Sequence, residues 1–226
     1  MKEQLQKDFD NTIKNLNLSQ KDIEIKKFSL DNFLNKGFPN RKEEDWKFSD
    51  LNQIIKKNIG ELSFYNDYTY TNKVDTSEFV DGLEHNKIVF INGRIEKIDF
   101  HYEKKEQIEI IDQSETINKF DNNNSLSDLN NALTNKSFKI VIKKGYQLLK
   151  PLIIYHTTNS KIWSKNINLR LDFELRENSC LRLIDLFNDT SQKNFLNIFY
   201  NFNLKENAIL KNYKVDKIEN KNIKYS

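Results

Sequence analysis

Two stretches in the second half of the chain alternate apolar and polar residues without a break, and this pattern constrains the fold more than any other feature. Side chains of a strand point alternately to its two faces, so a period of two predicts strands with one face buried and the other in water. The apolar positions are Ile167, Leu169, Leu171, Phe173 and Leu175 in the first stretch and Leu196, Ile198, Tyr200, Phe202 and Leu204 in the second. Further strands are predicted at 137–143, 151–156, 181–186 and 208–215.

The corners between these strands are short and contain asparagine. Residues 176–179 read Arg-Glu-Asn-Ser, and residues 205–207 read Lys-Glu-Asn. Such corners suit the coils of a β-solenoid, where the chain bends and returns one rung higher. A meandering β-sandwich is the competing arrangement, and the periodicity does not separate the two.

The first part of the chain has helical rather than alternating periodicity. Leu5, Phe9 and Ile13 recur at near-helical spacing, which predicts a helix over 2–17, and a second helix is predicted at 29–36. The expected regions are a helical N-terminal region at 1–60, a connecting loop at 61–86 and a β region at 87–226.

The window 37–51, which reads GFPNRKEEDWKFSDL, predicts a corner between two helices. Its glycine can end one helix, and the proline two residues later bars a simple continuation. Asn40 can cap the next helix, with Glu43 three residues on to close a capping box. We expect a helix from Asn40 with a buried Trp46, and Phe48 would add an apolar side chain to that helix or to its C-terminal end.

The same window resembles the N-terminal signature of the SufB/SufD family, most closely that of its SufD members. The matching residues are Gly37, Pro39, Arg41, Glu44, Trp46, Lys47, Phe48, Ser49 and Leu51. The resemblance continues, in the order in which SufD-like chains show these elements, through Asn92-Gly93, Leu129 to Leu133, Ile140 to Gly145, Pro151 to Ile154, Glu177 to Ile184 and Asn207 to Leu210.

The resemblance implies a fold that is mainly β with an α-helical N-terminal region. The family fold is a right-handed parallel β-helix, so the resemblance favours the solenoid over the sandwich. Residues 87–226 would form the first coils of that β-helix, which would be incomplete at its C-terminal end.

For function, the resemblance implies a non-catalytic scaffold subunit of the Suf iron–sulfur cluster assembly complex, with SufB-like and SufC-like subunits as partners. Such a chain is not an enzyme and binds no cofactor itself, because the wider complex handles the cluster and ATP. The family's cluster-associated Cys-x-His-Gly segment and its SufC-docking helix lie late in the chain, and nothing here matches them. We therefore expect an N-terminal fragment of a SufD-like subunit, with no catalytic or metal position to carry over.

Charge and composition argue against several other classes of function. Lys plus Arg (36) nearly balance Asp plus Glu (33), and this balance predicts neither a nucleic-acid nor a membrane partner. With only 5 Gly, a glycine-rich phosphate loop is not expected. The first residues lack the apolar core of a signal peptide, which predicts a cytoplasmic protein.

Histidine and cysteine supply few candidates for chemistry. Cys180 is the only cysteine, so no intrachain disulfide or Cys-based metal cage can form. His85, His101 and His156 are not spaced as a metal-ligand pair. His156 is expected in a surface or hydrogen-bonded role, and Cys180 as a buried or half-buried thiol.

Two other function classes remain open from the sequence. A β-solenoid or β-sandwich binding module could recognise a protein or polymer, with Trp163, Phe199 and Tyr200 as its natural contacts. A metal-dependent enzyme that uses histidines and carboxylates is the weaker alternative.

Overall fold

The structure is a computed structural model that describes residues 2–64, 80, 82–116, 124–158, 162–187, 193–216 and 223–225. Most of the expected connecting loop, at 65–79 and 81, lies outside these residues. Within the described part of the chain, no helix is long and apolar enough to cross a membrane.

Four α-helices lie in the described part of the chain: α1 (Lys2–Lys14), α2 (Gln20–Lys36), α3 (Leu51–Asn58) and α4 (Ser125–Leu133). Ser19 caps α2, because its hydroxyl accepts the backbone N–H of Asp22 at 3.2 Å. This cap explains why the second helix begins at Gln20 rather than at residue 29, where the apolar pattern placed it.

The helix predicted from Asn40 does not form. Glu43 Oε1 does accept the Asn40 N–H at 3.3 Å, but the chain continues as a turn and a short 3-10 helix, η1 (Glu44–Trp46). The α-helix begins only at Leu51, where the Asp50 carboxylate accepts the Gln53 N–H at 3.0 Å. Asp50 prevails as the cap because the apolar face that can pack on the other helices starts directly after it.

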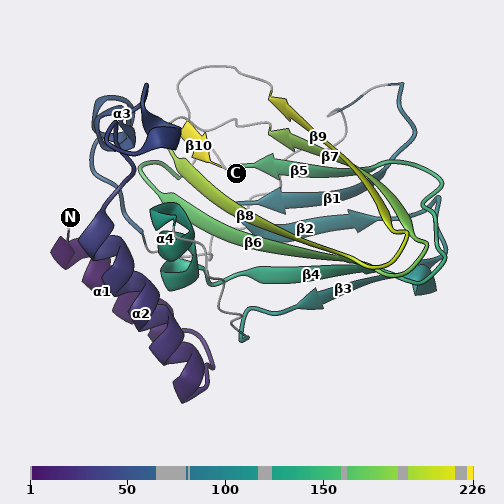
Figure 1. The fold of residues 1–226 in the computed structure, drawn as a ribbon, viewed down its shortest axis with the longest axis horizontal. Helices are drawn as coiled ribbons and strands as arrows, with labels where there is room; N and C mark the ends of the chain where they lie inside the picture. Colours follow the sequence, from purple (N-terminus) through teal and green to yellow (C-terminus); the bar gives the residue numbers. More distant parts are fainter. Residues whose placement is uncertain are drawn as a thin grey trace.

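In the residues that the structure describes, ten strands form two five-stranded sheets, ordered β2-β1-β5-β7-β9 and β10-β8-β6-β4-β3 (Figure 1). From β4 to β10, successive strands alternate between the two sheets. The strands are β1 (Asn86–Ile91), β2 (Arg94–Asp99), β3 (Ile108–Asp112), β4 (Ser137–Ile142), β5 (Leu152–Thr157), β6 (Asn166–Leu175), β7 (Cys180–Phe187), β8 (Phe195–Leu204), β9 (Ile209–Asp216) and β10 (Ile223–Tyr225); a short 3-10 helix, η2 (Lys105–Gln107), precedes β3.

The prediction of a mainly β chain folded as a right-handed parallel β-helix is wrong. The chain is mixed α/β, and each sheet combines parallel and antiparallel strands: β1 pairs antiparallel with β2 and β3 antiparallel with β4. One cause is local, since Asn92 and Gly93 both have positive φ (52° and 78°) and make the tight hairpin between β1 and β2. No closed sheet or coil is found in the described part of the chain, so the assignment of 87–226 to the first coils of a β-helix is also corrected.

The strands after residue 137 nevertheless do not pair with each other as antiparallel hairpins, as a meandering sandwich would require. β4, β6, β8 and β10 are parallel neighbours in one sheet, and β5, β7 and β9 in the other. Asn178 and Asn207 make the corners that carry the chain from one sheet to the other, with φ of 58° and 56°. Asparagine tolerates this left-handed conformation better than most residues, which is why it recurs at these corners.

The main core lies between the two sheets and is built from the inward row of each strand. A second core joins all four helices to Phe195 of β8. Helix α4 joins the helical core to the β-sheets, because it packs across β6 and β8 (Figure 1). The polar face of β6, predicted to lie in water, is therefore buried as well: Asn166, Asn168, Arg170 and Asp172 are all at most 7% exposed.

Candidate functional site

The signature residues lie in one corner between α2 and α3, and part of them serves packing. Gly37 ends α2 with φ of 74°, and its N–H donates to Phe33 O at 2.6 Å. Pro39 and Leu51 are buried, and Trp46 is half-buried against the helical core rather than fully buried as expected. Helix termination and packing therefore account for these signature residues, and no catalytic or binding role is needed to explain them.

The remaining signature residues, apart from the half-buried Ser49, face solvent. Arg41, Glu44 and Lys47 are exposed, and Phe48 is 90% exposed, the most exposed large hydrophobic side chain among the described residues. The Lys47 ammonium lies 5.8 Å from the centroid of the Phe48 ring, within reach of a cation–π contact. An aromatic ring held in water beside a cation is unusual for a purely structural corner.

A cleft of about 270 Å³ opens beside this ring, and we call it the Phe48 cleft. Its charged lining residues are Arg41, Lys57 and Asp50. The Asp50 carboxylate accepts the Gln53 N–H, so two cations and one hydrogen-bonded anion line the cleft.

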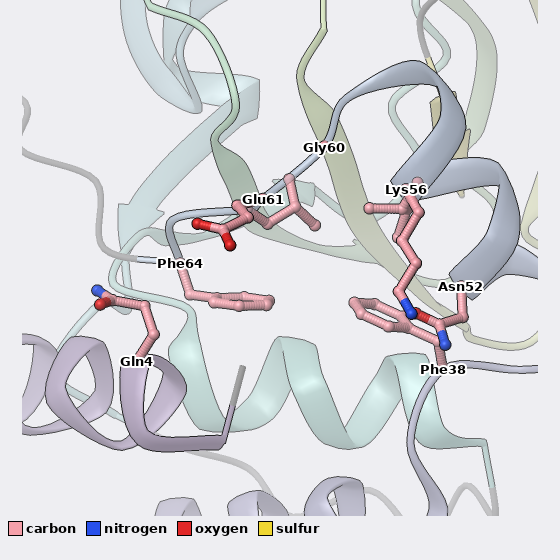
Figure 2. A pocket seen from close by; sticks show the side chains of 9 residues that line it. Gln4, Phe38, Asn52, Lys56, Gly60, Glu61 and Phe64 are labelled. Carbon is pink, nitrogen blue, oxygen red and sulfur yellow. The ribbon is translucent and has the colours of Figure 1, made fainter.

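A larger cavity of about 490 Å³ lies on the other face of α3, between α1 and the segment that follows α3 (Figure 2). The rings of Phe38 and Phe64 point into it from opposite sides, with Lys56 near one ring and Glu61 near the other. Its volume falls within the range of small-molecule sites, about 300 to 1,000 Å³. Because its rim carries a cation, an anion and amide groups, it favours no single ligand charge.

A buried polar cluster ties β5, β7 and β8 together across the main core. Tyr200 Oη donates to Asp185 Oδ1 at 2.5 Å and lies 2.8 Å from His156 Nε2, which therefore donates to the hydroxyl oxygen. The rings of Phe90 and Phe187 stack on His156 with centroids 5.5 and 4.8 Å away. Burial, followed by the Asp185 charge, raises the pKa of Tyr200 well above its usual value. This arrangement is that of a packed, hydrogen-bonded core histidine.

The other candidate residues are not brought together. Cys180 is a half-buried free thiol at the start of β7. His101 lies exposed beside Asp99, with Nδ1 2.8 Å from the carboxylate, and His85 Nε2 lies 2.8 Å from Tyr155 Oη. Among the described residues, no group of three or more His, Cys, Asp or Glu side chains is placed to hold a metal ion.

One end of the main core is only partly covered. Beyond Asn197, the outer edge of β8 pairs with no described strand, and neither does the outer edge of β9; we call this region, β9 with residues 198–204 of β8, the open end. Its inward side chains Tyr200, Phe202 and Leu210 are partly buried, whereas the inward row of β6 is at most 2% exposed. Its exposed apolar residues are Leu204 (44%), Ile209 (52%), Tyr213 (56%) and Val215 (46%).

The aromatic contacts proposed for a binding module do not form one surface. Tyr200 points into the core, whereas Phe199 faces outward, where the Arg170 guanidinium lies 5.4 Å from its ring centroid. Trp163 is 66% exposed in the segment before β6. Adjacent residues of a strand point to opposite faces, so the pair 199–200 never shared a side.

The Phe48 cleft and the open end were both missed by reasoning from sequence. Phe48 was expected to add an apolar side chain to a helix from Asn40 or to its C-terminal end, but that helix does not form. The signal that could have found it is Asp50, a stronger cap that is followed directly by Leu51, Ile54 and Ile55. At the open end the available signal was the sequence of β9, ILKNYKVD, in which two apolar and then two polar residues interrupt the alternation that β6 and β8 show.

Comparison with known proteins adds no assignment to this geometry: no protein-family model matches the chain, and no curated protein matches it.

Proposed function

We propose that this chain is a non-catalytic scaffold subunit of an iron–sulfur cluster assembly complex, similar to SufD, that acts in the cytoplasm through contacts with other subunits. In this proposal it binds no cofactor, and the cluster and ATP are handled by SufB-like and SufC-like partners. The match to the signature residues from Gly37 to Leu51 supports the family, and their packing at the α2–α3 corner agrees with a structural signature. The proposal does not depend on a β-helix.

The open end is the observation that carries this proposal. A strand edge without a neighbour presents free N–H and C=O groups that can pair with a strand of another chain. Beside that edge, partly buried core side chains and exposed apolar residues would be covered by the same contact. A scaffold subunit needs such a surface, whereas a catalytic role would require none of these features.

The partner we assign to the open end is the SufB-like subunit, bound as added strands that continue the two sheets. On the outward face of β9, Lys211 lies between the exposed apolar residues Ile209 and Tyr213, and Val215 follows. Lys214 lies on the opposite face, with its ammonium 5.8 Å from the centroid of the Tyr200 ring. The matching partner edge would carry apolar residues and carboxylates.

Co-expression with the SufB-like and SufC-like subunits of the same organism tests the proposal. We expect all three to co-purify, and the double variant Ile209→Lys/Val215→Lys to lose the partners, because it places charges where apolar side chains would be buried. The control is Ile98→Lys/Ile111→Lys, which changes residues of similar exposure (46% and 42%) on β2 and β3, at the opposite end of the sheets. Failure of the native chain to co-purify, or equal loss in both double variants, would refute the proposal.

A further inference from the structure

The Phe48 cleft lies on the face of α3 that points away from the cavity in Figure 2. Asn52, Ile55 and Lys56 line that cavity, whereas the Phe48 cleft is lined by Gln53, Ile54, Lys57 and Asn58. On a helix with 100° between residues, these two sets occupy opposite sides. The cleft is therefore a surface separate from that cavity.

The charged side chains of this surface are mostly basic. The side chains of Arg41 and Lys57 form no hydrogen bond or ion pair within the described part of the chain. The Asp50 carboxylate, which caps α3, is the one anion among the lining residues, and Glu43 turns back to accept the Asn40 N–H. Two of the three charged side chains that line the cleft are therefore cations, and Lys47 adds a further cation near the Phe48 ring.

Hydrogen bonds hold the backbone of the segment that carries Phe48. The Ser49 N–H donates to Trp46 O at 2.7 Å, and the Leu51 N–H donates to Pro39 O at 3.1 Å. Because this backbone is already ordered, only the two side-chain torsions of Phe48 lose freedom when a partner covers the ring. Covering it removes a large apolar surface from water, which is the usual source of binding energy at the centre of an interface.

We propose that the Phe48 cleft binds a short acidic segment of a partner protein. An apolar side chain of that segment packs on Phe48 and Ile54, and flanking carboxylates pair with Arg41 and Lys57. The volume of about 270 Å³ suits one or two side chains and is below the range of small-molecule sites. Charge and size together therefore favour a peptide over a cofactor.

Selection from an unbiased library of phage-displayed dodecapeptides tests this assignment. The native chain is the target, and Arg41→Gln/Lys57→Gln/Phe48→Ala is the counter-target. We expect the enriched sequences to carry Asp or Glu on both sides of a large apolar residue. Enrichment of basic or purely apolar sequences, or the same enrichment on both targets, would overturn the proposal.

The best enriched peptide, labelled with fluorescein, then gives affinities by fluorescence anisotropy. We expect roughly a tenfold loss of affinity for Arg41→Gln/Lys57→Gln and about fivefold or more for Phe48→Ala. The control variants are Lys105→Gln/Lys144→Gln and Trp163→Ala, which remove equally exposed charges and an exposed ring elsewhere and should bind as the native chain does. Equal losses in the controls, or full displacement by inorganic phosphate at the peptide's own concentration, would reduce the site to a general anion site and refute the peptide assignment.

Discussion

Strands β6 and β9 differ in sequence pattern and in burial: β6 alternates apolar and polar residues along its whole length, whereas β9 reads ILKNYKVD and alternates only from Tyr213 on. In β6 both faces are buried, the apolar row in the main core and the polar row under α4. In β9 the outward row is exposed and the inward row is only partly covered. The comparison shows that the sequence of a strand distinguishes its two faces, whereas the neighbouring elements of the fold decide whether each face is buried.

The polar face of β6 tolerates burial because its groups find partners. Asn130 of α4 donates to Leu169 O at 3.2 Å and to Asn197 O at 2.7 Å. Asn197 in turn donates to Leu126 O at 2.9 Å and to Asn168 Oδ1 at 3.0 Å. This asparagine layer lets a helix pack on a polar sheet face, since paired buried amides avoid most of the desolvation cost.

The largest expected difference between the covered region and the open end concerns core leucines. Leu171→Ala, at a position with 0% exposure, should lower the free energy of unfolding by about 3 to 5 kcal/mol, because it leaves a cavity between the sheets. Leu210→Ala, on the partly covered inward row of β9, should cost less than about 1 kcal/mol, since neighbours and water can fill the space. Urea denaturation measures both, and equal losses would contradict the comparison.

A second difference is expected in the pH dependence of stability. Lys26 of α2 is buried and donates to Asn131 O (3.0 Å), Ala132 O (3.3 Å) and Thr134 O (2.7 Å) at the end of α4. Burial, followed by the nearby Arg170 charge, lowers the pKa of Lys26 from 10.5 to about 7. The unfolded chain therefore binds more protons than the folded chain between pH 7 and 10.5, and stability rises with pH in that window.

Comparison of the native chain with Lys26→Met isolates this effect. Between pH 7 and 10 we expect the native free energy of unfolding to rise, relative to the variant, by on the order of 3 kcal/mol. Below pH 7 the two curves should run parallel. The matched control is the same substitution at the exposed Lys214 of the open end, Lys214→Met. A native curve parallel to that of Lys26→Met up to pH 10 would disprove the assignment.

The asparagine layer predicts a smaller difference. Asn130→Ala should lower the free energy of unfolding by about 1 to 3 kcal/mol, because it leaves buried carbonyl oxygens and the Thr134 hydroxyl without a partner. Asn212→Ala, on the exposed part of β9, should change it by less than about 0.5 kcal/mol. Thermal unfolding of the two variants side by side measures the contrast, and similar melting temperatures would count against a buried polar layer.

The smallest effect on stability is expected at the open end. Tyr213→Ser removes a ring that is 56% exposed and should shift the free energy of unfolding by less than about 0.5 kcal/mol. The same change should weaken capture of the SufB-like subunit, because the ring would be buried in that contact. A large loss of stability would mean that Tyr213 belongs to the fold, and unchanged capture would place the interface elsewhere.

Local signals in the sequence predicted much of the secondary structure correctly. The alternating stretches are β6 and β8, the Asn92-Gly93 pair makes a hairpin, and the Asn-containing corners have positive φ at Asn178 and Asn207. These features depend on the conformational preferences of a few adjacent residues. The helix expected from Asn40 did not form. Asn40 and Asp50 were both possible N-caps, and the local pattern did not show which of the two helices would have a face that could be packed.

Three features were decided only by the tertiary structure: which sheet each strand joins, whether its neighbours are parallel, and what covers each face. At the sheet edges, β2 pairs antiparallel with β1 and β3 pairs antiparallel with β4. The sheets are therefore mixed, whereas the predicted β-helix would have parallel strands. The same holds for the Phe48 ring, whose exposure follows from a helix that starts at Leu51. A period of two predicts that the two faces of a strand differ in polarity. The burial of each face is set by contacts between residues far apart in the chain, and no local pattern encodes those contacts.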